Sequence, residues 1–186
     1  MGRYFEHDTE IRNGEYPKIH DKLKNVIDVA DIDGKFVLDA GGCSGSFGLW
    51  CLRKGARQVV VNDFRSDYLA LCQEYDEIHR AKYGYTGRLI VDNQKICADS
   101  DFSYKVDTLI ARRIIYEIDD EEALGRFIDQ LIANGLKHVY LQGLVRVPNH
   151  KRKMWNVELE AQKFIEKGFK IRAYNGNDIM VLDKEN

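Results

Sequence analysis

The chain has 186 residues, the length of one domain, and 44% of them are hydrophobic, which is enough for a core. The 28 Lys and Arg nearly balance the 30 Asp and Glu. The net charge of −2 therefore excludes a protein that its overall field draws to nucleic acid or to an anionic membrane, and any such partner must meet a local patch.

The cysteines and the apolar runs bear on where the protein works. The four cysteines include no Cys-x-x-Cys pair, so a metal site or a disulfide framework is not expected, and a reducing compartment fits best. No apolar run reaches the ~18 residues of a membrane span, and the first ten residues lack the apolar stretch of a signal peptide. We expect a cytoplasmic protein with no membrane partner.

Hydrophobic periodicity predicts helices and strands that alternate along most of the chain. In chain order we expect a helix over 18–30, a strand over 36–40, a helix over 46–54, a strand over 59–61, a helix over 66–82 that ends near Gly84, strands over 89–91 and 106–110, a helix after Asp119, a strand over 138–141, a helix over 157–167, and a hairpin of strands over 169–173 and 179–182. This alternation implies right-handed crossovers and a parallel sheet with an antiparallel strand added at the end.

The expected fold class is therefore α/β, a three-layer doubly wound and mostly parallel seven-stranded sheet with a C-terminal antiparallel hairpin. We expect a single domain over 1–186. Residues 1–30 would form an N-terminal helix and lid, and residues 31–186 the cofactor-binding core.

The glycine-rich turn after the first expected strand is the most informative segment. Such a turn places backbone N–H groups beside a cavity at the carboxyl edge of the sheet, and Asp63 ends the next strand, where a carboxylate can accept the hydroxyl protons of a ribose. Cys43 stands where a dinucleotide fingerprint has its second glycine, which argues against NAD. Asp39 disfavours a polyphosphate but suits a ligand with an ammonium and a sulfonium group, as in S-adenosylmethionine.

The run Asp-Ala-Gly-Gly-Cys-Ser-Gly at 39–45, the acid at Asp63 and the order of elements resemble the class I S-adenosylmethionine-dependent methyltransferases, over roughly residues 18–183. The resemblance implies an enzyme that binds this cofactor between the glycine turn, the acid after the second strand and an Asp or Asn after the third. Carried over by position, the cofactor-binding residues are Asp39, Gly41, Gly42, Cys43, Ser44, Gly45, Asp63, Phe64, Asp92 and Asn93, with Asp99 competing for the adenine role.

The methyl acceptor is expected near the carboxyl ends of the fourth and fifth strands. The candidate acceptor-binding residues are Arg112, Arg113, Tyr116 and His20. Two neighbouring arginines favour a small anionic acceptor, such as a carboxylate or phosphate, unless they point outward and pair with acids. A sulfonium methyl is already activated, so no covalent nucleophile is needed, and the sequence assigns no catalytic base and no metal ligand.

Two alternatives remain open from the sequence. In the first, the chain methylates RNA or protein and uses the basic segment 146–155, which ends in Trp155, to bind that substrate, for example through RNA phosphates. The chain could also bind S-adenosylmethionine without transferring its methyl group, as a partner subunit, a sensor or an enzyme that cleaves the sulfonium. The sequence does not predict an oligomeric state.

Overall fold

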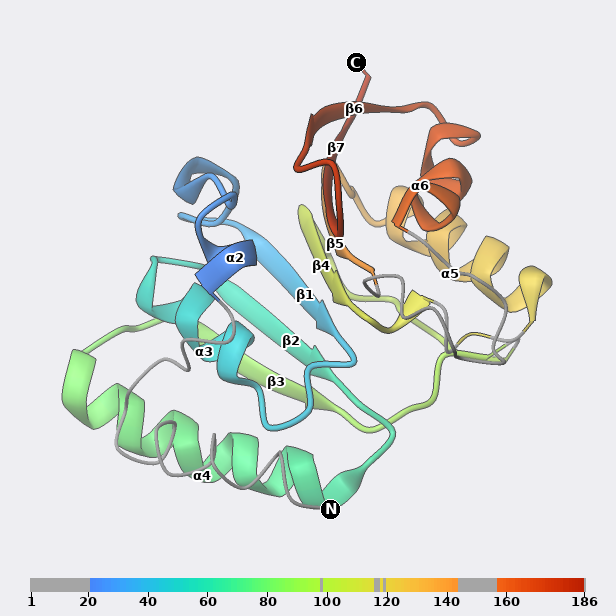
Figure 1. The fold of residues 1–186 in the computed structure, drawn as a ribbon. Helices are drawn as coiled ribbons and strands as arrows, with labels where there is room; N and C mark the ends of the chain where they lie inside the picture. Colours follow the sequence, from blue (N-terminus) through green and yellow to red (C-terminus); the bar gives the residue numbers. More distant parts are fainter. Residues whose placement is uncertain (1–20, 98, 116–117, 119, 144–156, 186) are drawn as a thin grey trace, which may run out of the picture. The chain divides into compact units, whose positions relative to one another are not determined.

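A computed structural model gives the fold, and it describes residues 21–97, 99–115, 118, 120–143 and 157–185 (Figure 1). The chain divides into two compact units, Met1–Gln94 and Lys95–Asn186. Each unit has its own strands and helices.

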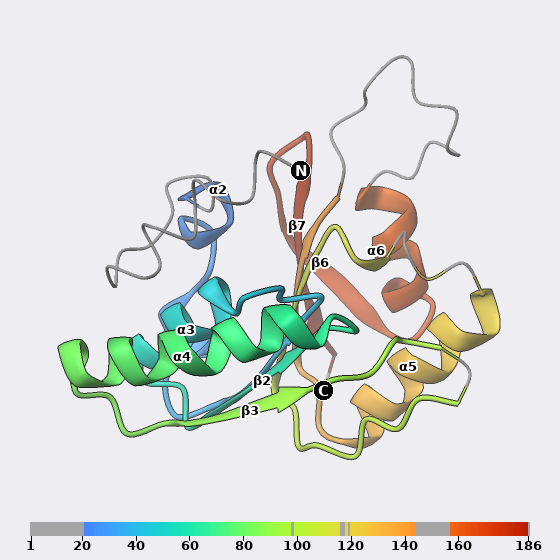
Figure 2. The same ribbon diagram turned by 90° about the horizontal axis from the view of Figure 1, so that it is seen from below.

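The first unit is built on three parallel strands in the order β3-β2-β1. Its elements in chain order are α2 (Asp21–Lys24), the 3-10 turn η2 (Val29–Asp31), β1 (Phe36–Ala40), α3 (Ser46–Arg53), β2 (Gln58–Asn62), α4 (Ser66–Tyr83) and β3 (Arg88–Asp92). Helix α3 contacts β1, β2 and α4, and α4 contacts β3, so both helices cover one face of this sheet (Figure 2). The run Val59–Val61 is buried, as the apolar sequence predicts.

The continuous helix predicted over 18–30 is wrong within the described residues. Helix α2 ends at Lys24, and a separate 3-10 turn follows. The side chain of Asp28 accepts a hydrogen bond from the backbone N–H of Ala30 over 2.9 Å. Asp side chains compete in this way with helical hydrogen bonds, which explains the break.

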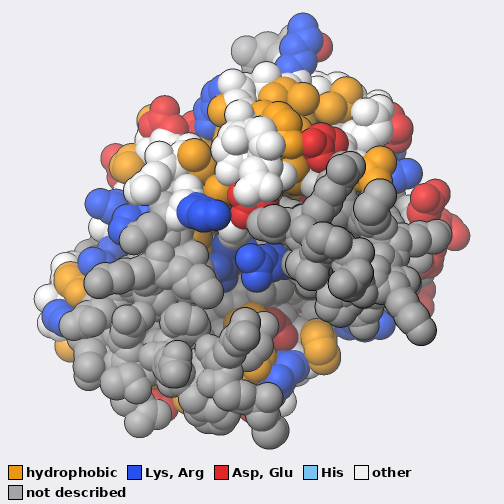
Figure 3. Space-filling model, viewed as in Figure 1, with side chains coloured by type: hydrophobic (Ala, Val, Ile, Leu, Met, Phe, Trp, Pro, Cys, Tyr) orange, Lys and Arg blue, Asp and Glu red, His pale blue; other side chains and the backbone are white. Residues whose placement is uncertain are grey.

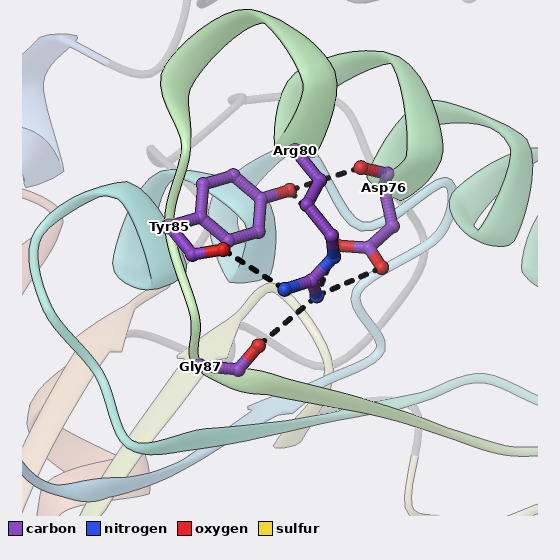
Figure 4. Close-up of polar contacts among 4 residues, drawn as sticks. All are labelled: Asp76, Arg80, Tyr85 and Gly87. Atoms are coloured by element: carbon purple, nitrogen blue, oxygen red, sulfur yellow. Dashed lines mark hydrogen bonds and ion pairs between the residues drawn. The ribbon is translucent and has the colours of Figure 1, made fainter.

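Three hydrogen bonds fasten the end of α4 to the chain that leads into β3, and an ion pair within α4 joins Arg80 to Asp76 (Figure 4). The Arg80 guanidinium binds the Asp76 carboxylate and donates to the carbonyl oxygens of Tyr85 and Gly87, over 2.9 and 3.0 Å. The Tyr85 hydroxyl donates to Asp76 over 2.8 Å, and burial together with that carboxylate raises the pKa of Tyr85. Since β3 begins directly after Gly87, this network positions the strand.

The second unit holds the other four strands, in the order β4-β5-β7-β6. Its elements in chain order are β4 (Thr108–Arg112), α5 (Glu121–Ala133), β5 (His138–Gln142), α6 (Val157–Ile165), β6 (Phe169–Tyr174) and β7 (Ile179–Lys184). Strands β4 and β5 are parallel, and β7 pairs antiparallel with both β5 and β6. Ion pairs from Lys163 in α6 to Glu121 and from Lys167, just after α6, to Asp129 join this part of the chain to α5.

The seven strands, the mostly parallel pairing and the C-terminal antiparallel hairpin confirm the predicted α/β fold class. The fourth strand starts two residues later than predicted, because the N–H of Val106 donates to Asn134 at the end of α5. Among the residues that the structure describes, no helix combines the length and the apolar character that crossing a membrane requires.

Candidate functional site

The parallel register of the first unit brings three chain segments to one edge. Ala40 at the end of β1 lies beside Asn62 at the end of β2, which in turn lies beside Asp92 at the end of β3. The segments that follow these strands therefore start side by side at the carboxyl edge. This is the edge where open α/β sheets bind ligands.

The turn after β1 needs residues with left-handed backbone. Gly41, Cys43 and Gly45 have φ of 64°, 51° and 74°. The N–H of Gly42 donates to the Asn62 carbonyl over 3.0 Å, and a Cβ on Gly42 would come within 2.8 Å of Val61. The turn is thereby pressed against the end of β2, and only a residue without a side chain fits at Gly42.

Asp39 is fully buried in β1, and its Oδ2 accepts the N–H of Gly48 in the first turn of α3 over 2.9 Å. A carboxylate is well suited to the N–H groups at a helix N-terminus. Asp39 thus fixes the start of α3 and the turn before it. Its predicted contact with a ligand stays a prediction.

Asp63 joins the glycine turn to β2. Its Oδ2 accepts the N–H of Cys43 over 3.0 Å, and its Oδ1 accepts the N–H of Arg65 over 2.9 Å. The side chain is 7% exposed, while Phe64 beside it is 65% exposed. A carboxylate has about four lone-pair positions, so each oxygen keeps capacity to accept one more hydrogen bond, for example from a hydroxyl group.

Hydrogen bonds also connect the end of β3 to the end of β2 at this edge. The backbone N–H of Asp63 donates to the Asp92 carbonyl over 3.1 Å, and the Asn93 side chain donates to the Asp63 carbonyl over 3.0 Å. The Asp92 carboxylate accepts from the side-chain amides of Asn62 and Gln94, over 3.0 and 2.9 Å. The structure therefore brings Asp92 and Asn93 beside Asp63, whereas Asp99 belongs to the second unit.

Asn62 and Gln94 were not predicted as site residues. Asn62 is a buried amide at the end of an apolar strand, directly before Asp63, and that position was the available signal. Its side chain also donates to the Gln94 carbonyl over 2.9 Å. No sequence pattern indicated Gln94.

The candidate acceptor residues are only partly described. Arg112 is half-buried at the end of β4, and Arg113 is exposed with φ of 56°. The N–H of Arg113 donates to the Gln142 carbonyl at the end of β5 over 2.7 Å, which holds this uncommon conformation. Tyr116, His20 and the basic segment 146–155 lie outside the described residues.

Replacing Gly45 by alanine should disrupt the turn. A Cβ there would lie 2.2 Å from the Cys72 sulfur, and φ is 74°. We expect Gly45→Ala to lower the free energy of unfolding by about 2–4 kcal/mol, measured by urea denaturation.

Gly84→Ala is the matched control, because φ there is also positive, at 67°, but no atom lies within 4 Å of the added Cβ. That variant should lose only about 1 kcal/mol, from backbone strain. The double change Gly45→Ala with Cys72→Ala should recover part of the loss. Equal losses for the two glycine variants would show that Gly45 is not packed as described.

Comparison with known proteins supports the fold. No protein-family model matches the chain, and no curated protein matches it. Among solved structures, a putative S-adenosylmethionine-dependent methyltransferase from Listeria monocytogenes is 12% identical, with a TM-score of 0.64 over 90% of this chain and 98% of that one. Magnesium protoporphyrin IX methyltransferase from Synechocystis PCC 6803, with bound SAH, is 18% identical, with a TM-score of 0.68 over 100% and 89%. A putative RNA methyltransferase from Pyrococcus horikoshii is 17% identical, with a TM-score of 0.59 over 95% and 89%.

The chain therefore has the fold of the class I S-adenosylmethionine-dependent methyltransferases, as the sequence resemblance predicts. The identities are too low to carry an acceptor over from any of these structures.

Proposed function

We propose that the chain is an S-adenosylmethionine-dependent methyltransferase that transfers a methyl group directly to a small anionic acceptor. The observation that carries the proposal is the position of Asp63, whose carboxylate closes the glycine turn and retains free acceptor capacity at the carboxyl edge of the sheet. The likeness to methyltransferase structures supports it.

The residues of this edge fit the proposed cofactor. Asp63 would accept the ribose hydroxyls, and the Asn93 side chain, exposed after β3, would approach the adenine amino group. Asp39, Asp63 and Asp92 make the edge acidic, which suits an ammonium and a sulfonium group and repels a polyphosphate. Gly41, Cys43 and Ser44 are partly exposed, so a ligand can reach the turn.

The bound cofactor supplies an electrophilic methyl group that is already activated for displacement. The work left to the protein is to hold the acceptor in line with that group and to exclude water, which can contribute about 7–11 kcal/mol through effective molarity. Arg112 and Arg113 at the end of β4 would hold an acceptor carboxylate or phosphate by charge-assisted hydrogen bonds. A base is required only for an acceptor that must lose a proton.

Incubation with methyl-labelled S-adenosylmethionine and separate pools of carboxylates, phosphates, RNA and protein tests the proposal. We expect label in the small anionic pools, and Arg113→Gln should reduce it at least about tenfold, as loss of one charge-assisted contact does. Label in RNA or protein alone would overturn the proposed acceptor class. Saturable binding with no labelled product, or cleavage of the cofactor without an acceptor, would overturn methyl transfer itself.

A further inference from the structure

The amino-terminal ends of β1, β2 and β3 carry a row of basic residues. They lie on the edge of the sheet opposite to the carboxyl edge, where the cofactor is proposed to bind. The backbone N–H of Arg57 donates to the Lys35 carbonyl over 2.9 Å, and that of Arg88 donates to the Arg57 carbonyl over 3.0 Å. Neighbouring strands lie ~4.8 Å apart, so the α-carbons of these three residues span about 10 Å. Arg53 and Lys54, at the end of α3, extend the row. We call these five residues the basic edge.

The charges of the basic edge are not neutralised within the part of the chain that the structure describes. None of its five residues forms an ion pair with a described carboxylate, whereas Arg65, Arg80 and Arg126 each do. Arg53 and Arg57 instead lie over aromatic rings, 3.8 Å from the ring centre of Tyr83 and 5.4 Å from that of Phe36. On the left of Figure 3, Lys and Arg side chains gather over the region where α3 and α4 end in Figure 1.

Helix-dipole compensation explains only part of this charge. Cations near the C-terminus of a helix are stabilising, and this accounts for Arg53 and Lys54 at the end of α3. It does not account for Lys35, Arg57 and Arg88, which lie directly before or at the start of strands. A row of cations across three strands that pair with no described carboxylate needs another explanation, and an anionic partner is the simplest.

We propose that the basic edge docks the phosphate backbone of single-stranded RNA. Guanidinium groups bind phosphate oxygens in a bidentate way. The Tyr83 ring is 39% exposed, so a base can stack on the part of the ring that Arg53 leaves open. Since the net charge of the chain is −2, such a partner must be bound by a local patch of this kind. This binding is separate from methyl transfer and does not require that the RNA be the acceptor.

RNA fits the basic edge better than an anionic membrane does. Tyr83 is the only exposed large apolar side chain of segments 33–36, 53–58 and 82–88. Peripheral membrane binding normally adds apolar residues that enter the acyl boundary to the basic ones. The carboxylates of Asp39, Asp63 and Asp92 at the opposite edge also steer a polyanion away from the cofactor site.

Fluorescence anisotropy with a labelled 20-nucleotide single-stranded RNA, without cofactor, tests the proposal. The wild-type protein should bind with a slope of log K against log salt of about −3, as four or five phosphate contacts give. The double variant Arg57→Gln with Arg88→Gln should bind about tenfold more weakly at 50 mM salt and with a slope about 1.4 smaller in magnitude. Tyr83→Ala should weaken binding about tenfold with the slope unchanged, because it removes stacking and no charge.

The control variant is Arg126→Gln with Lys170→Gln, which removes the same charge from exposed positions of the second unit. It should bind like the wild type. Equal weakening of both double variants, RNA binding that salt does not change, or binding to phosphatidylserine vesicles but not to RNA would each overturn the proposal. None of these results would bear on methyl transfer, which the labelled-cofactor experiment measures separately.

Discussion

The variant Asp63→Ala is expected to bind S-adenosylhomocysteine about 100-fold more weakly than the wild type. Two hydrogen bonds from ribose hydroxyls to a carboxylate contribute about 3 kcal/mol together, which is about 100-fold in affinity. The substitution also removes the hydrogen bonds that the N–H groups of Cys43 and Arg65 donate to the Asp63 carboxylate. The glycine turn therefore loses its side-chain hydrogen bond to the end of β2. Isothermal titration calorimetry measures the change directly.

Two further variants make the result specific. Asp63→Asn keeps the shape and one acceptor oxygen, so its affinity should fall between those of the wild type and Asp63→Ala. Asp67→Ala removes a nearby carboxylate that is exposed and pairs with Arg65, so it should bind like the wild type. An Asp63→Ala protein that is folded and binds with wild-type affinity would contradict the assignment of Asp63 to the ribose.

The stability of the protein is expected to depend on pH through Glu160, which lies fully buried in α6. Neither oxygen of its carboxyl group has a hydrogen-bond partner among the described residues, and burial raises its pKa from 4.5 to about 7. The unfolded chain ionises near pH 4.5, while the folded protein holds the proton up to about pH 7. The contribution of Glu160 to the unfolding free energy is therefore fully present below pH 4.5 and is lost as the pH rises to 7.

The variant Glu160→Gln should remove this pH dependence. Between pH 5 and 8 the wild type should lose about 2–3 kcal/mol of unfolding free energy relative to the variant, since one pKa unit corresponds to about 1.4 kcal/mol. Urea denaturation followed by circular dichroism at several pH values measures the difference. Glu166→Gln, at an exposed position just after α6, is the control. Its unfolding free energy should change with pH in the same way as that of the wild type. Parallel curves for the wild type and Glu160→Gln would show that the Glu160 carboxyl is solvated or paired.

Local signals in the sequence predicted most elements of the first unit. The apolar run Val59–Val61 indicated a buried strand, and Gly84 marked the end of α4 because it adopts left-handed backbone with φ of 67°. The helix over 18–30 failed for a local reason too, because apolar spacing does not record that the Asp28 side chain competes for backbone N–H groups.

The hydrogen bonds of the candidate site depend on contacts far apart in sequence. Asp63 was predicted as a ribose ligand. Its hydrogen bond with Cys43, however, joins residues 20 positions apart in the sequence and follows from the register of β1 and β2. The amides of Asn62 and Gln94 meet the Asp92 carboxylate only because β2 and β3 are aligned residue by residue. Spacing along a sequence does not specify such register, so these groups were found only in the structure.

We propose that the turn over 41–45 and Asp63 together hold S-adenosylmethionine. Titration of ¹⁵N-labelled protein with S-adenosylhomocysteine tests it most directly, because the amides of Cys43 and Arg65 donate to the two oxygens of Asp63. We expect large, saturable shifts of both amide resonances, with the amides of Gly34 and Gly176 unchanged. Saturating ligand that leaves Cys43 and Arg65 unshifted would contradict it.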